Sequence, residues 1–270
     1  MSRIRLYATE AIVLRRTDYG EADRLLTLIT PEMGKLRVIA KGARKITSRK
    51  AGHIELFTRV RLLLARGRTF DIVTQAETIE AHRALREDLR RGGYAHYLGE
   101  LVDQFTQEGS EDSAMYDLLA NGLLWVCEAQ DAAMAARCFE MRLLTIAGYR
   151  PQLFHCARTD APLEIDLAGQ AASLPYTPFS PVAGGALSAK AAAGDRDVIA
   201  LLPSTLKLMR LLQSKPPEEV MALDVPEATL RQVERAMRQY LSYVLERALR
   251  STRFLQEIET DDGRRTADDG

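Results

Sequence analysis

The sequence predicts a multidomain α+β protein in which an N-terminal five-stranded β-barrel is followed by an α-helical domain. Apolar residues alternate with polar ones up to about residue 80, whereas after His82 they recur at the spacing of helices. Between the helical segments, residues 150–194 are rich in Pro, Gly and Ala and are typical of a loop-rich insert. We therefore expect domains at residues 1–80 and 81–258, and a disordered tail at 259–270.

Five short strands account for the first domain. In order they are TEAIVLRR, DRLLTLIT, KLRVIAKG, TRVRLLLARG and FDIVTQAET, and turn residues separate them. Five strands in about 75 residues have the size and count of the oligonucleotide-binding (OB) barrel. On the third strand Val38 and Ala40 share one face and Arg37 lies on the other, which directs the apolar set into the barrel and the cations outward.

Amphipathic helices account for the second domain. Three are predicted, in YAHYLGELVDQF, AMYDLLANGLLWVCEA and DAAMAARCFEMRLLTIAG. The third has Asp131 as a candidate N-cap and Gly148 as a stop signal. A last long helix begins near Pro226, where apolar residues again follow helical spacing.

Positive charge is concentrated in the first domain, although the whole chain balances 37 Lys and Arg against 37 Asp and Glu. Residues 1–80 carry 16 basic and 9 acidic side chains, and the 22 residues from Met33 to Ile54 contain no acid. Such a cluster binds phosphate backbones by Coulomb attraction and counterion release, although a run of charge can also be an ordinary solvated face. The candidate DNA-binding residues are Lys35, Arg37, Lys41, Arg44, Lys45, Arg49, Lys50, Arg59 and Arg61.

Aromatic residues that could stack on bases are fewer. Tyr19, Phe57 and Phe70 are the candidates in the barrel, and we expect Phe57 and Phe70 to lie in its core.

Catalytic and metal-binding patterns are not found. The four His residues have no metal-ligand or nucleophile–base spacing, and the glycine-rich segments lack the GxxxxGK[ST] pattern. Asp18, Glu21 and Asp23 are expected to be solvated turn residues. The three Cys residues form no CxxC pair. Because these patterns are missing, we expect a protein that is not an enzyme and needs no cofactor. No apolar run approaches the roughly 18 residues of a membrane span, so we expect a cytoplasmic location.

Three segments resemble the bacterial RecO family of recombination mediators: EAIVLRRTDYGEADRLLTLIT, GKLRVIAKGARK and FEMRLLTIAGYRPQL. The resemblance covers about residues 8–215 and implies an OB barrel followed by a helical domain that often carries a small zinc-binding insert. It also implies binding to single- and double-stranded DNA. The implied partners are the C-terminal tail of single-stranded DNA-binding protein (SSB), RecR and, indirectly, RecA, in a nucleoid-associated protein that anneals complementary strands.

Two features of this chain bear on what the resemblance implies. Many relatives read CxxC, a Gly-Gly turn and a second CxxC, where this chain has Cys156, Thr159, Ser188 and Ala191. Structural zinc needs four thiolate or imidazole ligands, so we expect a degenerate insert without zinc. The second feature is a pair of cations, Arg137 and Lys207, which the resemblance places at the rim of an SSB-tail pocket. Ordinary exposed helix cations are the alternative.

Two other functions remain open at this point. An OB-fold RNA-binding protein without enzymatic activity would have the same basic barrel, and recognition of the SSB tail would distinguish it from a recombination mediator. A nuclease would need a carboxylate metal site, which the sequence does not offer.

Overall fold

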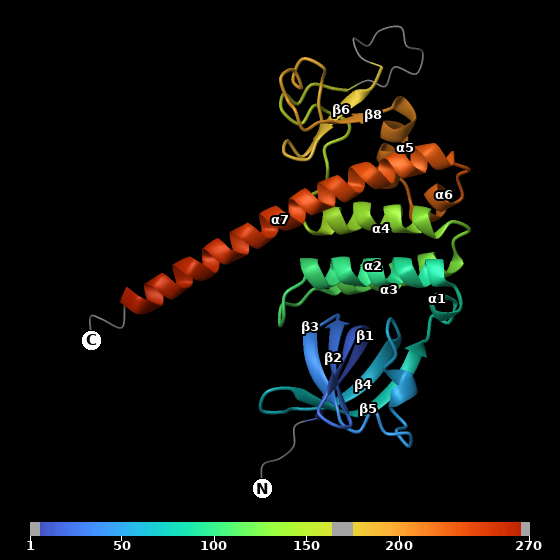
Figure 1. Cartoon of the computed structure of the whole chain (residues 1–270), viewed down its shortest axis with the longest axis vertical. Helices are drawn as coiled ribbons and strands as arrows, with labels where there is room; N and C mark the ends of the chain where they lie inside the picture. The colour runs from blue at the N-terminus through green and yellow to red at the C-terminus, as the bar shows by residue number, and fades with distance from the viewer. Residues whose placement is uncertain (1–5, 164–174, 266–270) are drawn as a thin grey trace. The chain divides into compact units, whose positions relative to one another are not determined.

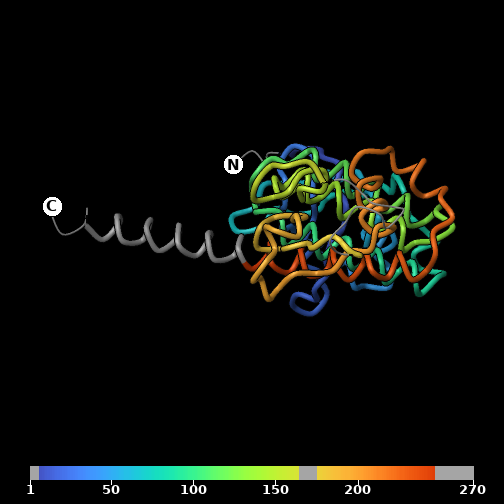
Figure 2. Tube along the Cα trace, turned by 90° about the horizontal axis from the view of Figure 1, so that it is seen from above, coloured from blue at the N-terminus to red at the C-terminus, as the bar shows by residue number. Residues whose placement is uncertain are grey.

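A computed structural model describes residues 6–163 and 175–265 of the chain, with side chains up to Glu246 in the last helix. The chain divides into two compact units. The first comprises Met1–Ile146 and Pro217–Ala222, and its described residues up to Ile146 are coloured from blue to green in Figure 2. The second comprises Ala147–Pro216 and Leu223–Gly270. The barrel and the first helices therefore belong to one compact unit, and the expected boundary at residue 80 falls within it.

The N-terminal barrel is closed and has five strands (Figure 1). They are β1 (Leu6–Tyr19), β2 (Asp23–Thr30), β3 (Gly34–Ala40), β4 (Arg59–Ala65) and β5 (Asp71–Glu80). Neighbours follow the order β1-β2-β3-β5-β4, in which β3 and β5 are parallel and the other pairs antiparallel. Val38, Ala40 and Leu62 are fully buried inside, which confirms both the predicted barrel and the face that each strand turns inward.

The first unit also contains helices. They are α1 (Ala84–Glu87), α2 (Leu89–Phe105), α3 (Ser113–Glu128), α4 (Ala132–Ile146) and α6 (Pro217–Met221). Of these, α2 and α3 contact the barrel. Figure 1 shows α2 and α3 next to the barrel and α4 on their other side. The carboxylate of Asp131 accepts a hydrogen bond of 2.9 Å from the backbone N–H of Ala133, which confirms the predicted N-cap.

The barrel meets α2 through an aromatic side chain. Phe57 is buried and its ring lies edge-on to His96, with ring centroids 4.9 Å apart. A Cβ atom at Gly99 would lie 2.7 Å from Cε1 of this ring, so only glycine allows the ring to come so close to the helix. Phe57 is therefore a core residue, as predicted. Phe70 is only partly buried, with the Arg37 guanidinium 5.6 Å from its ring centre, so the prediction that it lies in the core is wrong.

The second unit combines a small sheet with two helices. The antiparallel strands β6 (Thr177–Ser180), β7 (Gly185–Ala186) and β8 (Ile199–Leu201) pair in the order β7-β6-β8, beside α5 (Pro203–Ser214) and α7 (Glu227–Arg265). The sequence indicated only loops for residues 150–194, because strands this short show no alternation. The helix α7 continues to Arg265, into the segment predicted as a disordered tail, whose last residues lie outside the described ones. Within the described ranges, no helix is long and apolar enough to cross a membrane.

Candidate nucleic-acid interface

The nine predicted DNA-binding cations fall into two groups according to their place in the barrel. Four lie on strands, and these are Lys35 and Arg37 on β3 and Arg59 and Arg61 on β4. The other five lie in the segment between these strands, which we call the basic loop (residues 41–52), and these are Lys41, Arg44, Lys45, Arg49 and Lys50.

The strand cations hold the helices against the barrel. The Lys35 ammonium lies 3.0 Å from a carboxylate oxygen of Asp103 on α2 and also donates to the Asp103 carbonyl. The Arg59 guanidinium donates to Glu10 at 2.8 Å and to the hydroxyl of Tyr116 on α3 at 3.1 Å. The hydrogen bond from Arg59 keeps the pKa of Glu10 below its ordinary value, against the opposing effect of burial.

The other two strand cations are also paired with acids. Arg37 lies 2.7 Å from Glu108, and Arg61 lies 3.4 Å from Glu10. Because each of the four already lies beside a carboxylate, with Glu10 shared by Arg59 and Arg61, we expect them to attract phosphate less than four unpaired cations would.

Two cations of the basic loop anchor the loop to its neighbours. Arg44 approaches the Asp18 carboxylate at 3.3 Å, and its backbone N–H donates to the carbonyl of Ala22 at 2.9 Å. The ammonium of Lys50 donates to the backbone carbonyl of Val73 at 3.0 Å. Asp23, which was expected to be a solvated turn residue, accepts from the backbone N–H of Gly42 at 2.8 Å. The basic loop is therefore fastened to the β1–β2 hairpin.

Three cations remain directed to solvent. Lys41, Lys45 and Arg49 are exposed, and none of their side chains has an ion pair or hydrogen bond among the described residues. They lie in the acid-free window, on a loop that is held in place by Arg44 and Lys50. A phosphate backbone could neutralise all three without breaking an existing pair, so they form the part of the surface best suited to nucleic acid.

The predicted SSB-tail residues lie in different surroundings. Arg137 on α4 is 3% exposed, and its guanidinium pairs with the fully buried Glu140 at 2.8 Å. A residue so deeply buried cannot line the rim of a surface pocket in this conformation. Lys207 on α5 is exposed, as the prediction requires. Arg137 belongs to the first unit and Lys207 to the second.

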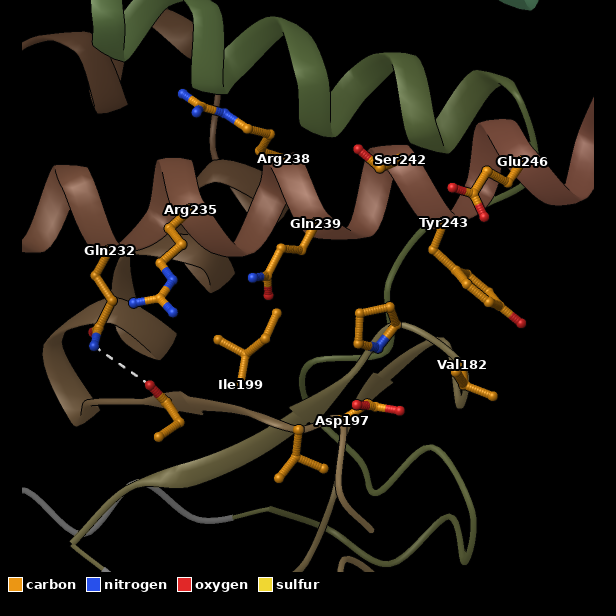
Figure 3. A pocket seen from close by; sticks show the side chains of 13 residues that line it. Val182, Asp197, Ile199, Gln232, Arg235, Arg238, Gln239, Ser242, Tyr243 and Glu246 are labelled. Carbon is orange, nitrogen blue, oxygen red and sulfur yellow. Dashed lines mark hydrogen bonds between the residues drawn. The ribbon is translucent and has the colours of Figure 1, made fainter.

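A cavity that the sequence did not indicate lies between α7 and the small sheet of the second unit. Its volume is about 830 Å³. Ile199 contributes to one wall, and Figure 3 shows Arg235 and Gln239 of α7 pointing toward it. Its charged lining residues are Asp197, Arg235, Arg238 and Glu246. The lining thus combines these charges with apolar residues such as Val182 and Ile199.

The residues at the expected zinc positions do not fit the metal. Cys156 is 1% exposed, and its sulfur accepts a hydrogen bond from the backbone N–H of Ser188 at 3.4 Å. Burial alone would raise the pKa of this thiol, but hydrogen bonds from Thr159 and from backbone N–H groups outweigh it and lower the pKa to about 6. Thr159 and Ser188 offer only hydroxyl groups and Ala191 offers no donor, so four strong ligands cannot surround a zinc ion.

Arg158 links the segment around Cys156 and Thr159 to the segment around Ser188 and Ala191, which together hold the expected zinc positions. Arg158 donates to the carbonyl of Ala191 at 2.6 Å and lies 2.7 Å from a carboxylate oxygen of Asp195. The insert is therefore held by polar contacts and not by packing alone.

Comparison with known proteins gives consistent matches along the chain. Family models described as "Recombination protein O N terminal" and "Recombination protein O C terminal" match residues 1–82 and 86–253. A protein named DNA repair protein RecO from Roseiflexus sp. (strain RS-1) is 43% identical over 256 residues, which cover 95% of this chain and 87% of that one. A protein of the same name from Pelotomaculum thermopropionicum is 37% identical over 255 residues, which cover 94% of this chain and 95% of that one.

Proposed function

The chain belongs to the RecO family of DNA-repair and recombination proteins, and from this premise we propose that it is a recombination mediator that binds single- and double-stranded DNA. The proposal includes a cytoplasmic, nucleoid-associated protein that works with RecR to help RecA replace SSB on gapped DNA, and that anneals complementary strands. Such work is an exchange between binding equilibria, so it needs neither a cofactor nor catalytic residues.

The observation that carries the DNA-binding part is the exposed, unpaired state of Lys41, Lys45 and Arg49 among the described residues. They project from an anchored loop of an OB barrel, the fold that many proteins use to bind single strands. Because contacts with phosphates carry no base information, we expect affinity to be nearly independent of DNA sequence and to fall steeply with salt.

An experiment on strand binding and annealing tests this part. Binding of the full chain to oligonucleotides of unrelated sequence is measured across a salt series, followed by the rate at which complementary strands anneal. We expect similar affinities for the different sequences and faster annealing with the protein present. An RNA-binding protein, which is the alternative, would bind RNA far more tightly than DNA of the same sequence.

The partner-binding part concerns the second unit. The SSB tail is acidic and ends in apolar residues, so it needs cations beside an apolar depression. Lys207 provides an exposed cation, and the cavity of Figure 3 combines apolar residues such as Ile199 with the exposed Arg235. We therefore propose that the tail binds to the second unit, with Lys207 or Arg235 as its cationic contact.

Charge reversal distinguishes these contacts. Lys207→Glu and Arg235→Glu are each tested for binding to a peptide of the SSB tail, with binding to bare DNA as the control. Loss of one charge-assisted contact at an exposed rim should cost about 1–3 kcal/mol, and DNA affinity should be nearly unchanged. If both variants bind the peptide as the unmodified chain does, the tail binds elsewhere.

A further inference from the structure

Two large apolar side chains are exposed, one on the basic loop and one on the β1–β2 hairpin to which this loop is fastened. Tyr19, at the end of β1, is 47% exposed, and Ile46, in the basic loop, is fully exposed. Neither position is explained by the barrel core, and neither contributes charge. Single exposed apolar residues are common on protein surfaces, so their setting decides whether these two have a role.

The setting is one anchored structure rather than two independent loops. The Arg44 guanidinium donates to the backbone carbonyls of Gly20 and Glu21, at 3.3 and 3.2 Å, and thus fastens the basic loop to the turn that follows Tyr19. Within the loop, the backbone N–H of Ser48 donates to the Lys45 carbonyl at 2.9 Å, which closes a turn around Ile46. Both apolar side chains are therefore presented by backbone that is tied in place.

Charge next to these side chains indicates what they contact. Lys41, Lys45 and Arg49 flank Ile46 in sequence, and no acidic residue occurs between Met33 and Ile54. Tyr19 lies beside the acids Asp18 and Glu21, and Asp18 is already paired with Arg44 of the basic loop. The basic loop therefore favours a negatively charged partner, and Ile46 and Tyr19 favour one that also offers apolar faces. Unpaired nucleotides combine these properties, because each has a phosphate and a base with a free π-face. A duplex offers the phosphates, but its bases are already stacked inside.

We propose that Tyr19 and Ile46 contact the unpaired bases of single-stranded DNA while the neighbouring cations bind its phosphates. Tyr19 supplies a flat ring for stacking, and Ile46 supplies an apolar contact at the tip of the loop. The inference rests on the proposed DNA-binding function and adds a preference for single strands that the cations alone cannot provide.

The test compares oligo(dT) of about 16 nucleotides, the upper end of the span covered by one OB fold, with a duplex of the same length. Tyr19→Ala should weaken binding to oligo(dT) about tenfold and binding to the duplex by less than about twofold, because stacking requires a free base. The slope of log K against log salt should be unchanged, since no phosphate contact is removed. Tyr19→Phe, which keeps the ring, should bind as the unmodified chain does. Ile46→Ser should show a smaller loss in the same direction, and Ile46→Val should not.

Several outcomes would overturn the inference. One is an equal loss of affinity for oligo(dT) and for the duplex. Another is a changed slope of log K against log salt. A third is unchanged affinity for oligo(dT) in both Tyr19→Ala and Ile46→Ser. Thermal melting of each variant shows whether the barrel is intact, and the conservative variants keep the test informative if an alanine or serine variant fails to fold. If removal of Lys41, Lys45 and Arg49 lowers the slope while the apolar variants have no effect, only this inference fails. If the cation variant has no effect, the proposed function itself fails.

Discussion

Replacement of Arg137 by Ala should destabilise the first unit strongly. The Arg137 guanidinium is 2.8 Å from Glu140, which is fully buried in α4 and also accepts a hydrogen bond from Tyr97. The variant would remove the Arg137 charge that pairs with Glu140 in the interior, and it would open a cavity where the Arg137 side chain packs. Breaking a buried pair in this way costs about 3–5 kcal/mol, whereas an exposed cation on a helix contributes less than about 1 kcal/mol.

The only Trp in the chain provides the assay. Trp125 lies on α3, and the Arg142 guanidinium of α4 is 5.6 Å from its ring centre, so its fluorescence reports on these two helices. In urea, unfolding free energy falls by about 1–3 kcal/mol per molar, so we expect the midpoint for Arg137→Ala to drop by about 1 M or more. Lys207→Ala, an exposed control, should leave the midpoint nearly unchanged.

A double variant separates loss of the ion pair from loss of side-chain volume. Arg137→Met combined with Glu140→Leu removes both charges and fills the space, so it should be close to the unmodified chain in stability or above it. If Arg137→Ala unfolds at the same urea concentration as the unmodified chain and loses SSB-tail binding selectively, our reasoning is refuted and Arg137 is a surface contact after all.

Three further predictions follow from the contacts described above. Purified protein should contain no stoichiometric zinc, and chelators should not lower its melting temperature. Arg158→Ala should lower the melting temperature, because Arg158 holds the insert together. One tightly bound zinc per chain, found by elemental analysis, would contradict this prediction. Arg59 lowers the pKa of Glu10 in the folded protein. The Glu10–Arg59 pair therefore contributes its full stability above the pKa of Glu in the unfolded chain, about 4.3. This contribution is lost as the pH falls through the lower pKa of Glu10 in the folded state. The stability difference between the unmodified chain and Glu10→Gln should therefore shrink below about pH 4.3, and a constant difference would oppose it. Arg44→Ala should flatten the salt dependence of DNA binding less than Lys45→Ala, because Arg44 is already paired with Asp18, and an equal effect would show that the pair opens on binding.

The barrel could be predicted from sequence because the pattern that indicates each strand lies within that strand's own few residues. Each strand alternates apolar and polar residues, and the interior positions Val38, Ala40 and Leu62 follow directly from that alternation. The helices were found for the same reason, since Asp131 caps α4 with a contact made two residues away. The small sheet was missed because β7 has only two residues, too few to show any period.

The site was predicted less completely because charge pairing depends on residues distant in sequence. The acid-free window correctly drew attention to the basic loop, yet Lys35 is paired with Asp103, 68 residues away. Arg137 was placed on a pocket rim by the resemblance to the RecO family, and the sequence of α4 by itself does not distinguish a buried cation from an exposed one. The signal that could have found it is Glu140, one helical turn later and facing the same apolar stripe.

The most direct test of the proposed function is the salt dependence of DNA binding when the three unpaired cations are removed. In Lys41→Ala/Lys45→Ala/Arg49→Ala, the slope of log K against log salt should become shallower by about two to three units, to a similar extent for unrelated DNA sequences. A control with the same change in charge, Arg196→Ala/Arg231→Ala/Arg238→Ala, removes exposed cations of the second unit and should leave the slope nearly unchanged. An unaltered slope in the basic-loop variant, with its melting temperature intact, would contradict the account and place the DNA-binding surface elsewhere on the chain.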